Sequence, residues 1–285
     1  MTVWRFFSCA LFAVALSSPA FSQIDGSNYD PQKDANIDLY IKNWNESEPR
    51  TTHGLLVEHE IFTRGNQLAP PRKGAVLEYV NRFSHATLNP GVSTKPVTLT
   101  GEQEIFYIVS GNGILKAGGT ATELHQDLCV LVPEGLEFII AATGTEPLTA
   151  FLISEPVPDG FTPNKEIVAH DNNTFPFSGT GHWSYQEKDL LLHNDGLGIL
   201  HAVITLTLDP MTIGHPHTHI KGCEEVWTTI RGNNYAWLGK QLREQPPGTA
   251  YMIPPDDKTN HSNINPSRDE KILMLYFSVR QDMTK

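Results

Sequence analysis

A group of residues that could bind a metal ion lies in the second half of the chain. His217 and His219 stand two positions apart in the run His-Pro-His-Thr-His, Glu225 follows soon after, and His261 comes later. On an extended strand, residues two apart point to the same face, so the two imidazoles can converge on one ion. Three imidazoles and one carboxylate, without thiolate, suit a divalent transition metal.

Short β-strands must position these side chains. The β-branched and aromatic residues 226–231 run from Glu225 into the turn Gly232-Asn233, which indicates a hairpin strand. Residues 249–253 form another apolar strand that Pro254 closes. The carboxylate is therefore expected on one strand and the third imidazole shortly after another.

The order of these residues resembles the cupin superfamily. The spacings that match its two motifs are Glu225-x6-Gly232, Gly248-x5-Pro254 and His261-x3-Asn265. Gly214 lies too close to the histidines, the loop between His219 and Glu225 is one residue too long, and the segment before His261 is two residues too long and has no glycine. The resemblance implies an all-β fold of cupin barrels, also called jelly rolls or double-stranded β-helices. It implies the metal ligands His217, His219, Glu225 and His261.

Two neighbouring glutamates compete for the carboxylate position. Glu224 fits the loop length of the cupin pattern, whereas Glu225 has the expected distance to Gly232. Neighbouring residues of a regular strand point to opposite faces, so only one of them can bind the ion, and we favour Glu225. Residues beside the ligands that are candidates for catalysis are His215, Tyr251 and Glu224. Further candidates for the surroundings of the site are Lys221, Trp227 and Arg231.

The first half of the chain repeats the second. The segment from Glu104 to Asn112 matches Glu225 to Asn233, and Leu88-Asn89-Pro90 matches Leu208-Asp209-Pro210, at a period of 120 or 121 residues. Such a period predicts two tandem barrels. Counted from the prolines, His217 and His219 fall on Val97 and Leu99; counted from the glutamates, they fall on Pro96 and Thr98. The position of His261 falls on Phe138, in the segment that follows Pro133. Only Glu104 remains, so a degenerate first barrel without metal is expected.

Five segments are expected along the chain. Residues 1–22 carry the single charge Arg5 before a short apolar stretch and small residues, which is typical of a secretory signal peptide that is cleaved before Gln23. Residues 23–72 are expected as an N-terminal extension and 73–154 as the first cupin domain. Residues 155–190, rich in proline and turns, are expected as a linker, and 191–285 as the metal-binding second domain.

Composition narrows the function. Without residues 1–22 the chain has 263 residues and a net charge of −12, because Arg5 is the only charged residue removed. This acidity argues against nucleic acid and anionic membranes as partners. We expect a periplasmic or secreted protein that is not bound to a membrane after cleavage. Its expected partner is a small-molecule substrate, and a homo-oligomer is also compatible with the sequence. The cysteines of the mature chain, Cys129 and Cys223, are expected to be unpaired.

The cupin resemblance implies several reaction classes, which include dioxygenases, decarboxylases, isomerases and lyases. The leading hypothesis is an enzyme with one divalent metal per chain that oxygenates, decarboxylates or cleaves an organic acid, phenolic compound or sugar acid. Mn or Fe is favoured, and Zn, Ni or Cu also suits the donors. The alternative is a non-catalytic periplasmic protein that binds a sugar or a metal.

Overall fold

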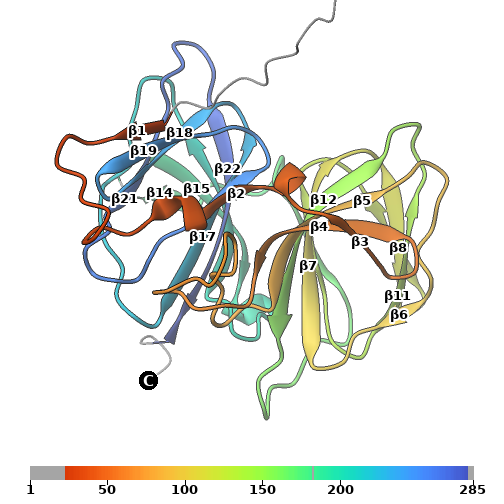
Figure 1. Cartoon of the computed structure of the whole chain (residues 1–285). Helices are drawn as coiled ribbons and strands as arrows, with labels where there is room; N and C mark the ends of the chain where they lie inside the picture. The colour runs from red at the N-terminus through yellow and green to blue at the C-terminus, as the bar shows by residue number, and fades with distance from the viewer. Residues whose placement is uncertain (1–22, 182, 282–285) are drawn as a thin grey trace, which may run out of the picture.

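The chain forms two barrels, each from one seven-stranded and one four-stranded antiparallel sheet (Figure 1). The structure is a computed structural model that describes residues 23–181 and 183–281. The all-β fold of two tandem jelly-roll barrels, predicted from the sequence, is confirmed. The expected signal peptide lies outside the described residues. No helix among the described residues is long and apolar enough to cross a membrane.

The first barrel contains eleven strands. Its sheets have the orders β13-β10-β7-β12-β5-β4-β3 and β6-β11-β8-β9. Their bounds are β3 (Pro49–Thr52), β4 (Leu56–Thr63), β5 (Arg82–Leu88), β6 (Val97–Thr98), β7 (Glu102–Ser110), β8 (Gly113–Ala117), β9 (Thr120–Leu124), β10 (Leu128–Val132), β11 (Glu137–Ala142), β12 (Leu148–Pro156) and β13 (Val168–Asp171).

The second barrel repeats this arrangement. Its sheets have the orders β14-β15-β16-β22-β17-β20-β2 and β1-β19-β18-β21. Their bounds are β1 (Gln23–Asp25), β2 (Ile41–Asn43), β14 (Gly179–Gly181), β15 (Tyr185–Leu192), β16 (Ala202–Leu208), β17 (Cys223–Arg231), β18 (Asn234–Leu238), β19 (Gln241–Gln245), β20 (Thr249–Met252), β21 (His261–Ile264) and β22 (Ile272–Arg280). The described part of the chain also contains three short 3-10 helices, η1 (Ile37–Leu39), η2 (Trp44–Glu46) and η3 (His193–Asp195).

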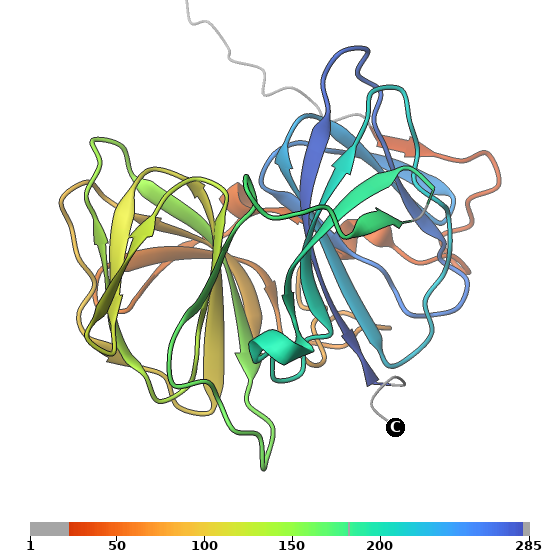
Figure 2. The same ribbon diagram turned by 180° about the vertical axis from the view of Figure 1, so that it is seen from behind.

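The two barrels include more of the chain than the domain boundaries predicted from the sequence. Residues 23–72 are no separate extension, because β1 and β2 pair with the second barrel while β3 and β4 pair with the first. Residues 155–190 are no simple linker, because β13 joins the first barrel and β14 and most of β15 join the second. In Figure 2 this green segment runs along the first barrel and crosses to the second. Backbone pairing between distant segments carries no local sequence signal, which explains the error.

The glycines that mark the repeat close equivalent hairpins. Gly111 and Gly232 follow β7 and β17 with φ of 79° and 82°, a region that favours glycine. A Cβ atom on Gly111 would lie 2.3 Å from the carbonyl oxygen of Pro147, and one on Gly232 would lie 2.9 Å from that of Lys271. The spacing from each glutamate to its glycine therefore fixes the register of the strand that bears the carboxylate.

Side chains on alternate sides of the strands form three apolar clusters. One fills the first barrel and another the second, whereas the largest lies between the barrels. There Phe83 of the first barrel packs against Phe277 of the second, with ring centroids 5.1 Å apart. Such aromatic burial is a strong apolar contribution to association. The two barrels therefore share one hydrophobic core and form a single packed unit.

Two buried carboxylates also join the barrels, and each binds one of two loops that the repeat relates. Glu224 of β17 accepts hydrogen bonds from the backbone N–H groups of residues 78–80, at 2.6–3.0 Å, and from the amide of Gln67 at 3.1 Å. Glu155 of β12 accepts from the N–H groups of residues 198–200, at 2.8–2.9 Å, and from the amide of Gln103 at 2.6 Å. Each barrel thus binds a loop of the other: Glu224 holds the loop before β5, and Glu155 holds the loop before β16.

Candidate metal centre

Four side chains converge at one end of the second barrel. They are His217 and His219 from the loop before β17, Glu225 from β17 and His261 at the start of β21. One nitrogen or oxygen of each lies within 4.8 Å of those of the other three. The structure therefore brings together all four residues that the sequence predicted as metal ligands.

The two histidines were expected on a regular strand, but they lie on an irregular segment instead. Residues 209–222 form an irregular segment between β16 and β17, and within it His217 makes an isolated antiparallel bridge with His261. Pro216 lacks an N–H group and therefore cannot take part in a continuous ladder. The bridge still holds His217 beside His261, so the imidazoles converge without the predicted strand.

The ring nitrogens lie at distances that a shared ion explains. His261 Nε2 is 3.1 Å from His217 Nε2 and 3.2 Å from His219 Nε2, and Glu225 Oε1 is 3.2 Å from His219 Nε2. Two ligand atoms at right angles around an ion lie about 3.0 Å apart when each is about 2.1 Å from it. The spacing of the four atoms therefore fits one transition metal ion.

The other ring nitrogen of each histidine faces a protein partner. His217 Nδ1 lies 3.0 Å from the carbonyl oxygen of His215, which can only accept, so Nδ1 carries the proton and Nε2 keeps its lone pair. His219 Nδ1 lies 3.3 Å from Cys223 Sγ, and His261 Nδ1 lies 3.2 Å from the Tyr251 hydroxyl. Such partners orient metal-binding imidazoles and select the tautomer. The surroundings thus present three Nε2 atoms to one point.

Two buried donors hold the carboxylate. Trp227 Nε1 donates to Glu225 Oε1 at 2.7 Å, and the Tyr276 hydroxyl donates to Oε2 at 2.9 Å. Arg280 Nη2 is farther from Oε2, at 4.0 Å. The side chain of Glu225 is only 3% exposed, so these donors compensate its loss of water. Trp227, one of the candidates for the surroundings, is therefore a wall of the site, on the same face of β17 as Glu225.

The charges of the cluster favour a cation beside the carboxylate. Burial disfavours the charged form of His219, but the Glu225 carboxylate outweighs this effect and raises the pKa of His219 to about 10. Burial would raise the pKa of Glu225, yet His219 and His261 hold it below its ordinary value. Because a metal ion must displace the proton on His219, binding should release protons.

Replacing Tyr251 by phenylalanine should weaken metal binding without removing a ligand. The hydroxyl group holds the ring of His261 from behind, and loss of such an orienting partner typically lowers metal affinity about 10- to 100-fold. Competition with a chelator measures the affinity. Tyr235→Phe is the control, because its hydroxyl group bonds Glu244 instead of a ligand. Equal affinities of the two variants would contradict this role of Tyr251.

The proposed catalytic residues have different positions. Glu224 is fully buried and points to the first barrel, away from Glu225, so it does not reach the site. Tyr251 is also buried, behind His261. His215 is half-buried, with its ring parallel to that of His217 at 5.9 Å and in contact with the exposed Trp183. Among these three candidates, His215 alone lies on the side of the cluster that solvent reaches.

The remaining candidates lie outside the site. Lys221 is exposed. Arg231 forms two hydrogen bonds of 2.8 and 2.9 Å with Asp127 of the first barrel, so it joins the barrels. Cys129 and Cys223, the cysteines of the described chain, are buried and unpaired, as expected. The contact of Cys223 with His219 was not predicted. Those of Tyr276 and Arg280 were not predicted either, because both residues belong to β22, whose register with β17 could not be predicted.

The strand pairing confirms which residues replace the histidines in the first barrel. Phe138 pairs with Val97 and with Ala117, just as His261 pairs with His217 and Leu238. Val97 packs against the apolar cluster inside this barrel, and Leu99 and Phe138 belong to it. The count from the prolines, which placed Val97 and Leu99 at the positions of His217 and His219, was therefore the correct alternative.

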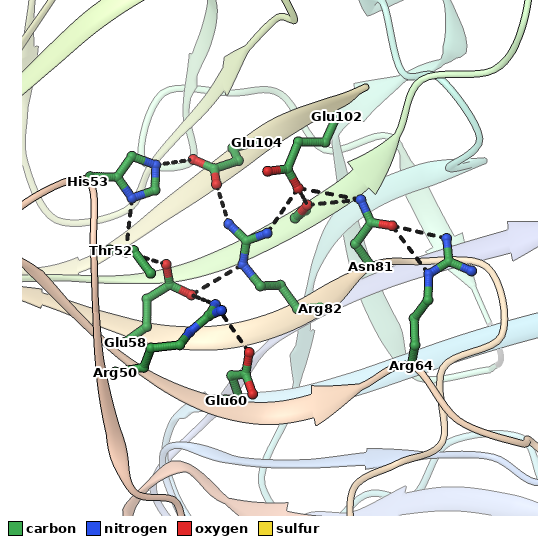
Figure 3. A network of polar contacts seen from close by, with 11 residues as sticks. Arg50, Thr52, His53, Glu58, Glu60, Arg64, Asn81, Arg82, Glu102 and Glu104 are labelled. Atoms are coloured by element: carbon green, nitrogen blue, oxygen red, sulfur yellow. Dashed lines mark hydrogen bonds and ion pairs between the residues drawn. The ribbon is translucent and has the colours of Figure 1, made fainter. Parts of the chain in front are cut away.

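Glu104, the equivalent of Glu225, belongs to a network of ion pairs (Figure 3). Arg82 bonds to Glu104, to Glu102 at 2.9 Å and to Glu58 at 3.3 Å, and His53 lies 3.0 Å from Glu104. Burial disfavours protonation of His53, but Glu104 overrides it and raises the pKa. The carboxylate of Glu104 is therefore paired with cationic side chains. The guanidinium group of Arg82 thus balances the negative charge of these carboxylates, and no metal ion is needed to do so.

Comparisons with known proteins agree with this architecture. The family model described as "Cupin domain" matches residues 84–154 of the first barrel. No curated protein matches the chain in sequence. YlbA from E. coli is 14% identical, with a TM-score of 0.66, over 89% of this chain and 96% of that chain.

Two other solved structures are similar in fold. A single-residue variant of oxalate decarboxylase from B. subtilis is 12% identical, with a TM-score of 0.65, over 88% of this chain and 80% of its own. The 7S globulin of Momordica charantia is 10% identical, with a TM-score of 0.63, over 85% and 84%. At these identities the likeness concerns the fold. Residues 84–154 therefore contain a cupin domain, and the chain as a whole has the fold of a two-domain, bicupin-like protein.

Proposed function

We propose that the chain is a metal-dependent cupin enzyme that acts on a small, oxygen-rich substrate by oxygenation, decarboxylation or lyase chemistry. The observation that carries the proposal is the convergence of three Nε2 atoms and one carboxylate oxygen at 3.1–3.4 Å. The Nδ1 partners of the histidines support it, because they leave the Nε2 lone pairs for an ion. The donor set suits Mn or Fe, and also Zn, Ni or Cu.

His217, His219, Glu225 and His261 would hold the ion, which would supply stabilisation of negative charge on substrate oxygens and, in the case of Fe or Mn, activation of dioxygen. The chain supplies the surroundings of this chemistry. Trp227 and Tyr276 keep Glu225 ionised and oriented. The side chains of His261 and Glu225 are 2% and 3% exposed and that of His219 is 11% exposed, so the cluster opens toward its loop histidines. His215 and Trp183 lie on this side and would meet the substrate first.

The test combines metal analysis with a screen for turnover. Protein purified without added ions is analysed for its metals and is then incubated with organic acids, phenolic compounds and sugar acids, with and without oxygen. The proposal expects one transition metal per chain and turnover that a chelator abolishes. Metal-free protein that cannot be loaded, or turnover that survives removal of the metal, would contradict it.

A second candidate function is non-catalytic binding of a sugar or a metal. The enclosure of part of the cluster favours it, because the side chains of His261 and Glu225 are only 2% and 3% exposed. A purely structural ion would be enclosed by protein ligands, whereas a catalytic ion needs an open position. Exchange of solvent water on a bound paramagnetic ion, measured by relaxation, separates the two: slow or absent exchange favours the binding protein.

We also propose that the protein is exported, with Gln23 as the mature N-terminus. The physical reason is the apolar stretch after Arg5, which is followed by the small residues Ala20 and Ser22 at the cleavage site. Mass spectrometry of protein from the cell envelope fraction should give a chain that begins at Gln23. Retention of Met1 on that protein would contradict both the cleavage and the periplasmic or secreted location.

A further inference from the structure

An exposed tryptophan lies beside the side of the metal cluster that solvent reaches. Trp183 stands in the turn between β14 and β15 and is 71% exposed. Its ring meets the ring of His215 edge to face, with centroids 4.7 Å apart, and the ring of His215 lies parallel to that of the predicted ligand His217. The ring of Trp183 therefore borders the approach from solvent to the ligands.

The backbone of Trp183 is strained. Its φ of 72° lies in the left-handed region, where a bulky side chain is rare and glycine is usual. Five residues other than glycine have a positive φ within residues 23–181 and 183–281, and three of them adjoin the ligand histidines. These are Trp183, Met211 on the loop of residues 209–222, and Asp257, whose N–H donates to the carbonyl oxygen of His219. Such strain gathers at active sites and ligand clamps. A single exposed apolar side chain needs no explanation, but a strained one at this place indicates a function.

The turn that carries Trp183 is fixed to the loop of residues 209–222. The hydroxyl group of Ser184 donates to the carbonyl oxygen of Ile213 at 2.9 Å. The buried Tyr185 packs so closely on Gly214 that a Cβ atom there would lie 2.2 Å from the tyrosine oxygen. The two residues that follow Trp183 are therefore held in place, while the indole ring itself stays open to solvent. A ring presented in this way is a preformed surface for stacking.

The loop of residues 209–222 offers apolar groups to a ligand, because its polar side chains other than the histidines and Lys221 are bonded within the protein. Thr212 donates to the carbonyl oxygen of Asp209, Thr218 donates to Asp257, and the carboxylate of Asp209 pairs with Lys271. Met211 and Ile220, in contrast, are 69% and 53% exposed. A sugar acid needs partners for its several hydroxyl groups, whereas a flat aromatic ring needs a face to stack on. The surroundings of Trp183 suit the aromatic ring.

We propose that Trp183, paired with His215, binds the aromatic ring of the substrate and thereby selects phenolic compounds among the classes that the proposed function admits. The inference deepens that function and rests on it, because the oxygen atoms of the same molecule would reach the metal. The edge-to-face pair forms a corner, so a planar ring that stacks on the indole meets the imidazole with its edge. Trp183 is then a residue that determines specificity.

The experiment measures binding of 3,4-dihydroxybenzoate to the full chain by calorimetry. The chain is loaded with Zn²⁺, which has no redox chemistry, and oxygen is excluded. Trp183→Gly should weaken binding about tenfold, and Trp183→Tyr should restore most of it. Phe177→Ala is the matched control and should leave the affinity unchanged, because Phe177 is 63% exposed beside β14 but lies under Lys188. Binding of gluconate, which has no aromatic ring, should not depend on Trp183.

Thermal unfolding gives a second readout. Glycine adopts a positive φ without strain, so Trp183→Gly should melt no lower than the unmodified chain. Trp183→Asn repeats both measurements, since asparagine also tolerates this backbone. Lower melting temperatures of both variants would show that the ring stabilises the fold instead of serving a ligand, and would overturn the proposal.

Three further results would overturn it. One is an affinity for 3,4-dihydroxybenzoate that Trp183→Gly changes less than twofold, and another is gluconate binding that falls as much as that of the aromatic acid. The third is a dimer in gel filtration that Trp183→Gly converts to a monomer, because the ring would then belong to an interface between two copies. Elemental analysis of the same samples separates the two proposals. A chain that takes up no metal contradicts the proposed function, whereas the effect of Trp183→Gly on the affinity tests the ring in either case.

Discussion

Chains that carry His217→Ala or His261→Ala are expected to retain no bound transition metal and no metal-dependent activity, whereas Glu104→Gln should keep one ion per chain. The two histidines hold their Nε2 atoms 3.1 Å apart across the shared point. Removal of either leaves two imidazoles and one carboxylate in an environment where Glu225 then attracts a proton to His219 instead. Elemental analysis of gel-filtered protein measures the stoichiometry.

The Glu104→Gln variant tests whether the first barrel contributes a site. The histidine positions of this barrel hold Val97, Leu99 and Phe138, which pack in or against its apolar core, and the charge of Glu104 is balanced by Arg82 and His53. No neutral nitrogen donor set surrounds Glu104 in the described chain. Two ions per chain in the unmodified protein, or one ion that survives loss of both His217 and His219, would move the site out of the second barrel.

The sequence was sufficient to predict which four side chains converge, because the spacings that decide it are local. Glu225 lies seven residues before Gly232, and the positive φ of that glycine fixes the register of β17. The repeat then identified Phe138 as the counterpart of His261, and the pairing of β8 with β11 confirms it. Where the spacing within one hairpin decides the geometry, counting residues is enough.

Contacts between distant segments could not be predicted in the same way. Tyr276 reaches Glu225 because β22 pairs with β17, and Arg82 reaches Glu104 because β5 and β7 both pair with β12. His53 arrives from a turn with φ of 48° in the supposed extension. These contacts depend on how distant strands pair with one another, and the residues near the motifs do not indicate this pairing. The same reason explains why the domain boundaries were wrong.

Glu224 and Glu225 should give opposite results when each is changed to glutamine. Glu225→Gln should strongly lower metal occupancy, because it removes the anionic ligand. Glu224→Gln should keep the metal but lower the free energy of unfolding by about 2–3 kcal/mol, because an amide group replaces one of two oxygens that face N–H donors. Three of these donors are backbone groups of residues 78–80 in the first barrel.

Urea denaturation of chelator-treated protein isolates this second effect, because a metal that binds only the folded chain would otherwise add to the measured stability. Glu123→Gln on the exposed side of β9 is the matched control and should change the unfolding free energy little. Glu155→Gln should resemble Glu224→Gln, since Glu155 binds residues 198–200 through the same set of donors. If Glu224→Gln instead empties the metal site and Glu225→Gln does not, the longer loop after His219 has shifted the register of β17 by one residue. In that case Glu224 would face the ion and Glu225 the first barrel.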